Sequence, residues 1–171
     1  METTVATDLS TPDLSTPDLS GTDLIGTDLS SSDLIATSTT LTGIDCWELL
    51  ATEQFGRVGL LVNGQPEILP VNYAIDGKTI LFRTSEGSVL NEASMRVFAF
   101  EVDRVNVATH EGWSVMVQGV AQDIGNAIDP TSERLKRLAL ITWAPGTRQS
   151  WFRIDPDKVT GRRLYLTADA L

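Results

Sequence analysis

Alternating apolar and polar residues recur along the chain after residue 41, and they predict a domain built mostly of strands. Residues 96–105 show the pattern clearly, because Phe98, Phe100 and Val102 fall on one face of an extended chain. The segments with this character define the predicted strands. They are 57–62, 67–75, 78–83, 96–105, 113–124, 151–154 and 162–166.

Turn residues separate these segments at short intervals. Asn63-Gly64 follows the first strand, and Asp76-Gly77 joins the second strand to the third, as is typical of β-hairpins. Gly119 lies inside the long segment 113–124, where it favours a bend. Asp155-Pro156-Asp157 predicts a turn between the last two strands.

Helical patterns are few and short. Thr42 and Asp45 fit a capping box, and the apolar residues that follow predict a helix ending near Thr52. Pro130 suits the first turn of a helix that continues to about Leu140. Residues 89–93 predict one more short helix.

Six or so strands joined mostly as hairpins, with short helices, predict an antiparallel barrel. The chain contains no Gly-x-Gly-x-x-Gly run and no phosphate-binding loop with its lysine. A βαβ dinucleotide-binding unit is therefore not expected.

Residues 1–40 have a different character, because an Asp-Leu pair recurs there every five residues. A step of five gathers the leucines on no single face of a helix or strand. The period resembles that of pentapeptide-repeat proteins, but the residue before each Asp is Thr, Pro or Ser rather than Ala. We therefore interpret residues 1–40 as a disordered acidic tail and residues 41–171 as the folded domain. The pairs begin at Asp8, Asp13, Asp18, Asp23, Asp28 and Asp33.

Charge follows the same division of the chain. The net charge is −10, and the tail contributes seven of the 23 acids without any Lys or Arg. The domain keeps 16 acids against 13 bases, or −3, so no basic face for nucleic acid or an anionic membrane is expected. With one cysteine, no secretory signal and no apolar run of about 18 residues, we expect a cytoplasmic protein.

Side chains that could carry acid–base or nucleophilic chemistry are scarce. The one histidine, His110, lies in a polar turn, where solvation is expected. The one cysteine, Cys46, precedes Trp47 in the first helix and is expected to be a buried structural thiol. No metal site and no catalytic residue is predicted, so reactivity would have to come from a bound cofactor.

One segment has the composition of an anion-binding loop. A strand delivers Arg83 and Thr84, and a hydroxyl-rich turn with Gly87 and Ser88 then leads into the short helix. Arginine binds phosphate in a bidentate manner, and hydroxyls or helix-start amides can complete the site. An ordinary strand-to-helix loop with a capping serine explains the same residues equally well.

The order of motifs along the domain resembles the pyridoxamine 5′-phosphate oxidase-like family of flavin-binding split barrels. The resemblance covers nearly everything after Leu41. The matching residues are 56–59, 70–77, 80–84, 87–88, 90, 97–103, 112–119, 143–146, 151–156 and 159–162.

This resemblance implies a six-stranded split barrel that forms a homodimer with two cofactor sites at the subunit interface. FMN is the usual ligand of the family, and some members take a deazaflavin. The resemblance places Val71, Asn72 and Tyr73 along the isoalloxazine ring, and Arg83, Thr84, Gly87 and Ser88 around the phosphate. Trp151 and Arg153 resemble the residues that reach the flavin from the partner subunit.

Val89 departs from the family pattern, since many members have a phosphate-binding Lys directly after the Gly-Ser pair. Our leading hypothesis is a flavin-dependent oxidoreductase that acts on a small organic substrate. A non-catalytic module that binds or senses flavin is the alternative. A third hypothesis is an interaction protein whose tail docks a partner while the barrel serves as a dimeric scaffold.

Overall fold

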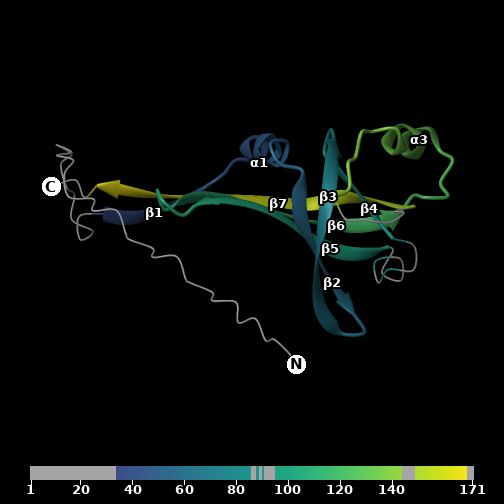
Figure 1. Cartoon of the computed structure of the whole chain (residues 1–171), viewed down its shortest axis with the longest axis horizontal. Coiled ribbons are helices and arrows are strands. Elements are labelled where there is room, and N and C mark those ends of the chain that lie inside the picture. Colours follow the sequence, from purple (N-terminus) through teal and green to yellow (C-terminus); the bar gives the residue numbers. More distant parts are fainter. Residues whose placement is uncertain (1–33, 86–87, 89, 91–94, 144–148, 169–171) are drawn as a thin grey trace, which may run out of the picture.

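The computed structural model describes residues 34–85, 88, 90, 95–143 and 149–168 (Figure 1). Seven strands and two helices are placed within these ranges. The strands are β1 (Leu34–Thr40), β2 (Phe55–Val62), β3 (Gln65–Asp76), β4 (Thr79–Thr84), β5 (Arg96–Asn106), β6 (Glu111–Asp123) and β7 (Ser150–Ala168). The helices are α1 (Gly43–Leu50) and α3 (Pro130–Lys136).

Six of the strands close into a barrel. They follow the order β7-β4-β3-β2-β5-β6, every neighbouring pair is antiparallel, and β6 pairs with β7 to complete the ring. The predicted six-stranded antiparallel barrel is therefore confirmed. Both predicted hairpins are present, with positive φ angles at Asn63, Gly64 and Gly77.

The predicted turn at residues 155–157 is wrong, because the last two predicted strands form the single strand β7. Asp155 and Pro156 pair with Val120 and Gly119 of β6, and a register shift takes up the residue that follows them. A β-bulge accommodates a proline inside a sheet without ending the strand. β7 can therefore run along both β4 and β6.

The two helices begin where they were predicted to begin. Thr42 forms the expected capping box with Asp45, whose Oδ2 lies 3.0 Å from the Thr42 nitrogen. The helix α3 ends at Lys136, four residues before the predicted end, and the chain leaves it toward β3. The helix predicted at residues 89–93 lies, apart from Leu90, outside the described residues.

The expected boundary between tail and domain needs correction for its last seven residues. Residues 34–40 form β1, which pairs along its whole length with the end of β7. Residues 34–40 have no apolar face to bury, so their order comes from this pairing, which gives their backbone N–H and C=O groups partners in β7 instead of water. Residues 1–33 lie outside the described residues, so their disorder stays a prediction.

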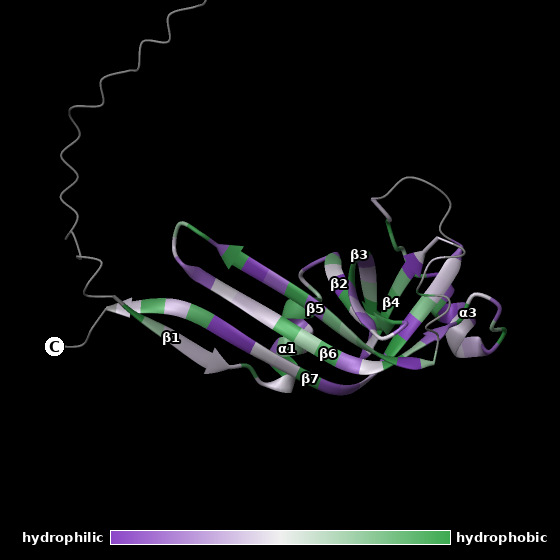
Figure 2. Cartoon of the chain, turned by 90° about the horizontal axis from the view of Figure 1, so that it is seen from below, coloured by the Kyte–Doolittle hydropathy of each residue, from purple (hydrophilic) through white to green (hydrophobic). Residues whose placement is uncertain are grey.

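The sheet extends beyond the barrel as a long projection, shown in Figures 1 and 2. We call this projection the arm. It consists of β1 with the paired ends of β7, β6 and β5, residues 159–168, 111–117 and 102–106. The helix α1 packs on one face of the arm, and its Cys46 and Leu50 join the barrel core.

Candidate functional site

The strand β4 separates the barrel core from a second, outer surface. Ile80 and Phe82 point into the main core, whereas Leu81 belongs to a smaller apolar cluster with Ile124 and Leu135 of the α3 region. Because side chains alternate along a strand, Arg83 shares the outer side with Leu81. Packing of Leu81 in this small cluster therefore holds β4, the strand that carries Arg83, against the α3 region.

Arg83 lies against an aromatic ring on this outer surface. The residue pairs with Trp151 across β4 and β7, and its guanidinium carbon lies 4.5 Å from the centre of the Trp151 ring. Arg153 is two residues further along β7, and its Nε lies 3.2 Å from Asp155 Oδ2. The structure therefore brings three of the predicted site residues, Arg83, Trp151 and Arg153, onto one surface.

Asn72 of β3 holds the neighbouring loops at the same place. Its Nδ2 donates to the Gln54 carbonyl oxygen at 3.2 Å, and its Oδ1 accepts from the Trp143 backbone nitrogen at 2.8 Å. The Trp143 ring stacks on Phe55, with centroids 5.5 Å apart and planes 4° from parallel. Asn72 therefore positions the loop that follows α3.

Four of the residues described above, Phe55, Asn72, Arg83 and Trp143, line a cavity of about 300 Å³. Arg83 carries the charge among the described residues of its lining, and most of the rest are apolar or aromatic. The lining consists of Phe55, Pro70, Val71, Asn72, Arg83, Thr142 and Trp143. A cationic group beside flat apolar walls suits a ligand that has both an anionic group and a planar ring system.

Two predicted site residues have their side chains on the other side of the sheet. The buried Tyr73 hydroxyl donates to the Leu50 carbonyl oxygen at 2.5 Å, and its ring meets Phe100 edge to face. Burial raises the pKa of Tyr73 well above its ordinary value. Thr84 is also buried and donates to Ser88 Oγ at 3.0 Å. Gly87 and Val89 lie outside the described residues.

Sequence reasoning did not assign roles to Phe55 and Trp143. Trp143 belongs to one of the runs that carry the family resemblance. Its position beside β3, however, depends on the hydrogen bond that its backbone nitrogen donates to Asn72, and this contact is not visible in the local sequence. Cys46 is buried as expected, and burial raises the pKa of its thiol. His110 is exposed, at a positive φ of 53° in the β5–β6 turn.

The described residues offer no group of three or more His, Cys, Asp or Glu that could hold a metal ion. Neither helix in the described part of the chain is long and apolar enough to cross a membrane.

A family model described as pyridoxamine 5′-phosphate oxidase matches residues 44–163. The chain belongs to this family. The matched range contains β2 to β6, α3 and most of α1 and β7, and so includes every residue of the cavity lining.

Similar proteins come from mycobacteria. The chain is 38% identical to the Mycobacterium tuberculosis protein Rv3129 over 89 residues, which cover 52% of this chain and 77% of that protein. It is 31% identical to Rv0080 of the same organism over 126 residues, covering 70% of this chain and 81% of that protein. Among solved structures, the FAD binding protein from Mycobacterium smegmatis matches with a TM-score of 0.62 and 34% identity, covering 74% of this chain and 97% of that chain.

Proposed function

We propose that this protein is a flavin-dependent oxidoreductase whose flavin binds on the outer surface of the barrel around Arg83. The observation that carries the proposal is the Arg83 guanidinium stacked 4.5 Å from Trp151, beside the cavity that Asn72 and Val71 line. The similarity to an FAD binding protein supports a flavin as the ligand.

The residues present fit a flavin by their chemistry. Arg83 would bind the phosphate, with Ser88 as a hydroxyl partner. Thr84, on the opposite side of β4, would position Ser88 by donating to its Oγ. The backbone of β3 at Val71 and Asn72 would lie along the ring system, while Phe55 and Trp143 would exclude water from one side. When bound, the flavin would supply the hydride chemistry, which the lining side chains cannot supply themselves.

We propose that a second copy of the chain completes the site. A cavity of about 300 Å³ is at the small end of the range of about 300–1,000 Å³ that is typical of ligand pockets. Ile68 is 72% exposed and alternates with Pro70 and Asn72 along β3, so the exposed surface continues into the cavity wall. Leu61 and Val97 on the adjoining strands are exposed as well. A homodimer would cover this apolar surface and the open side of the cavity together.

FMN is the cofactor that we propose first, because the family resemblance favours it, and FAD and a deazaflavin are the alternatives. A non-catalytic flavin-binding or flavin-sensing protein is the second candidate function. The lining of the cavity favours this candidate in one respect. Its charged residue, among those described, is Arg83, and an arginine does not act as a general acid or base near neutral pH, as many catalysts must.

The test is to purify the protein and titrate it with FMN, FAD and a deazaflavin while recording absorbance and fluorescence. Binding of any of the three supports the flavin assignment, and failure of all three to bind contradicts it. Reduced nicotinamide and candidate electron acceptors are then added to the loaded protein. Turnover supports the oxidoreductase, and a flavin that stays oxidised under all donors supports the binding protein.

A further inference from the structure

A second, smaller cavity of about 230 Å³ lies between the C-terminal end of α1, the strand β3 and the segment after α3. We call it the α1 pocket. It adjoins the candidate flavin cavity but shares no lining residue with it among the described residues. The lining consists of Leu50, Ala51, Glu53, Gln54, Tyr73, Ala74, Ile75, Ala139 and Ile141.

The charge of the α1 pocket is negative. Glu53 is the charged residue among the described lining, and its side chain is 29% exposed. The C-terminal end of a helix carries a partial negative charge, and the last turn of α1 contains no basic residue to offset it. Burial, and after it the charge of Glu53, raises the pKa of Tyr73, so its hydroxyl stays protonated. A positively charged ligand therefore suits this pocket better than a negative one.

The strand β3 presents an unpaired edge to the α1 pocket. Its pairing with β2 ends at Asn72, whereas its pairing with β4 continues to Asp76. The Tyr73 N–H points away from β4, since it donates to the Gln54 carbonyl oxygen at 3.1 Å. Successive residues of a strand direct their backbone groups to opposite edges, so the Tyr73 carbonyl and both backbone groups of Ile75 face this open edge. Two carbonyl oxygens for one N–H favour a ligand rich in donors.

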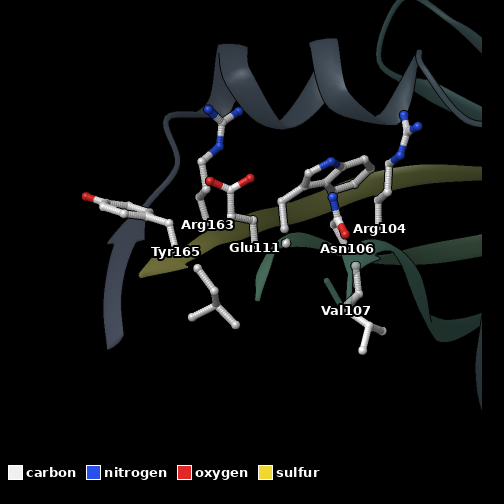
Figure 3. Close-up of a pocket in the computed structure, with 10 residues that line it drawn as sticks. Arg104, Asn106, Val107, Glu111, Arg163 and Tyr165 are labelled. Atoms are coloured by element: carbon white, nitrogen blue, oxygen red, sulfur yellow. The ribbon is translucent and has the colours of Figure 1, made fainter. Parts of the chain in front are cut away.

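Arg104 is the cation that the structure places against Glu53. Its side chain extends from the arm toward α1 (Figure 3), and its Nη1 lies 3.5 Å from Glu53 Oε1. This distance is long for a charge-assisted hydrogen bond, and Arg104 is 72% exposed. Exposed ion pairs of this kind contribute little, and Arg104 is not part of the pocket lining. The Glu53 carboxylate is therefore available to a cation inside the pocket.

We infer that the α1 pocket binds a small planar cation of the amidinium or guanidinium class, with its N–H groups on Glu53 and on the open edge of β3. Planar cations of this class match a carboxylate with two parallel hydrogen bonds. Ile141 and Ala139 offer apolar contact to the group that carries the cation. The volume lies below the range of about 300–1,000 Å³ for drug-sized ligands, so this group is a single ring or a short chain.

The experiment titrates the full chain with benzamidine, benzamide and benzoate. The three probes have the same ring and nearly the same shape, and they are cationic, neutral and anionic. Nuclear magnetic resonance of the ¹⁵N-labelled protein gives the affinity and locates the site, since the Ile75 amide faces the pocket. Benzamidine should shift the Ile75 amide signal and bind about tenfold more tightly than benzamide, because only the cation forms a charge-assisted contact with Glu53. Benzoate should bind more weakly than either.

Three variants test the role of each charge. Glu53→Gln should lower the affinity for benzamidine about tenfold, to that for benzamide. Glu48→Gln removes an exposed carboxylate of α1 outside the pocket lining and should leave the preference unchanged. Arg104→Gln should tighten benzamidine binding about twofold to threefold, because a competing cation is lost. Thermal melting checks that each variant is folded.

Equal affinities of the unaltered chain for benzamidine and benzamide would overturn the inference, as would a preference that persists in folded Glu53→Gln. Signal shifts that leave Ile75 unaffected would place the probe elsewhere and also contradict it. If benzamidine competes with FMN, the cation occupies the flavin cavity and the inference is wrong. The inference does not rest on the proposed function, since Glu53→Gln should bind FMN as the unaltered chain does.

Discussion

No Cβ fits at Gly119, where β6 pairs with β7 beside the register shift. A side chain there would collide with the Asp155 carbonyl oxygen, which belongs to the segment that carries the register shift. The glycine therefore allows the close approach that closes the barrel. The strand β7 pairs with β4 over residues 150–154, just before this register shift, and there Trp151 meets Arg83.

We expect Gly119→Ala to lower the free energy of unfolding by about 2 kcal/mol or more, because the backbone of β6 or β7 must move. Gly43→Ala is the matched control, since nothing lies within 4 Å of a Cβ at that position in α1. It should leave stability unchanged or raise it by up to about 1 kcal/mol. Urea unfolding measures both, and equal stability of the two variants would contradict this account of the barrel closure.

At the scale of elements, β1 shows that the folded part of the chain begins before the first aromatic residue. It is an edge strand of mixed composition, LIATSTT, and its partner is the end of β7. Because it belongs to the arm and not to the barrel ring, its loss should weaken the arm without opening the barrel.

Two truncations test the contribution of β1. Removal of residues 1–40 should lower the free energy of unfolding by about 1–3 kcal/mol relative to removal of residues 1–33, because the pairing with β7 is lost. Residues 1–33 are common to both deletions, so the comparison isolates the strand. Equal thermal and urea stability of the two truncated proteins would show that β1 contributes nothing to the domain.

Local signals in the sequence predicted the elements whose cause is local. The hairpin turns at residues 63–64 and 76–77 and the capping box at Thr42 depend on neighbouring residues, and all three are present. The continuity of β7 through Pro156 and the pairing of β1 depend on partner strands far along the chain, which local patterns do not encode. The same holds for the site. The composition of its segment already indicated Arg83, and the family resemblance added Trp151, but the hydrogen bond from Trp143 to Asn72 spans 71 residues and no local pattern predicts it.

At the scale of the whole molecule, the candidate site and the exposed apolar surface of β2, β3 and β5 are continuous. Ile68 lies next to Pro70 and Asn72 on this surface, and these two residues line the cavity. A homodimer formed through this surface would bury the patch and close the site in one step.

The variant Ile68→Glu should therefore weaken the dimer, because a carboxylate would be buried twice in a symmetric interface. Sedimentation velocity at micromolar concentration should show a dimer for the unaltered chain and a larger share of monomer for the variant. Ile128→Glu is the control, since Ile128 is 90% exposed in the loop before α3 and away from the patch. A monomeric unaltered chain would contradict the shared site.

The central claim is that Arg83 holds the phosphate of a flavin, and calorimetric titration with FMN tests it most directly. Loss of a charge-assisted contact corresponds to about 1.5–3 kcal/mol, so Arg83→Ala should raise the dissociation constant about tenfold to a hundredfold. Arg162→Ala, on the arm, should bind FMN as the unaltered chain does, and thermal melting checks that both variants are folded. If folded Arg83→Ala binds FMN, or whichever flavin the unaltered chain prefers, with unchanged affinity, the assignment of the phosphate site to Arg83 is wrong.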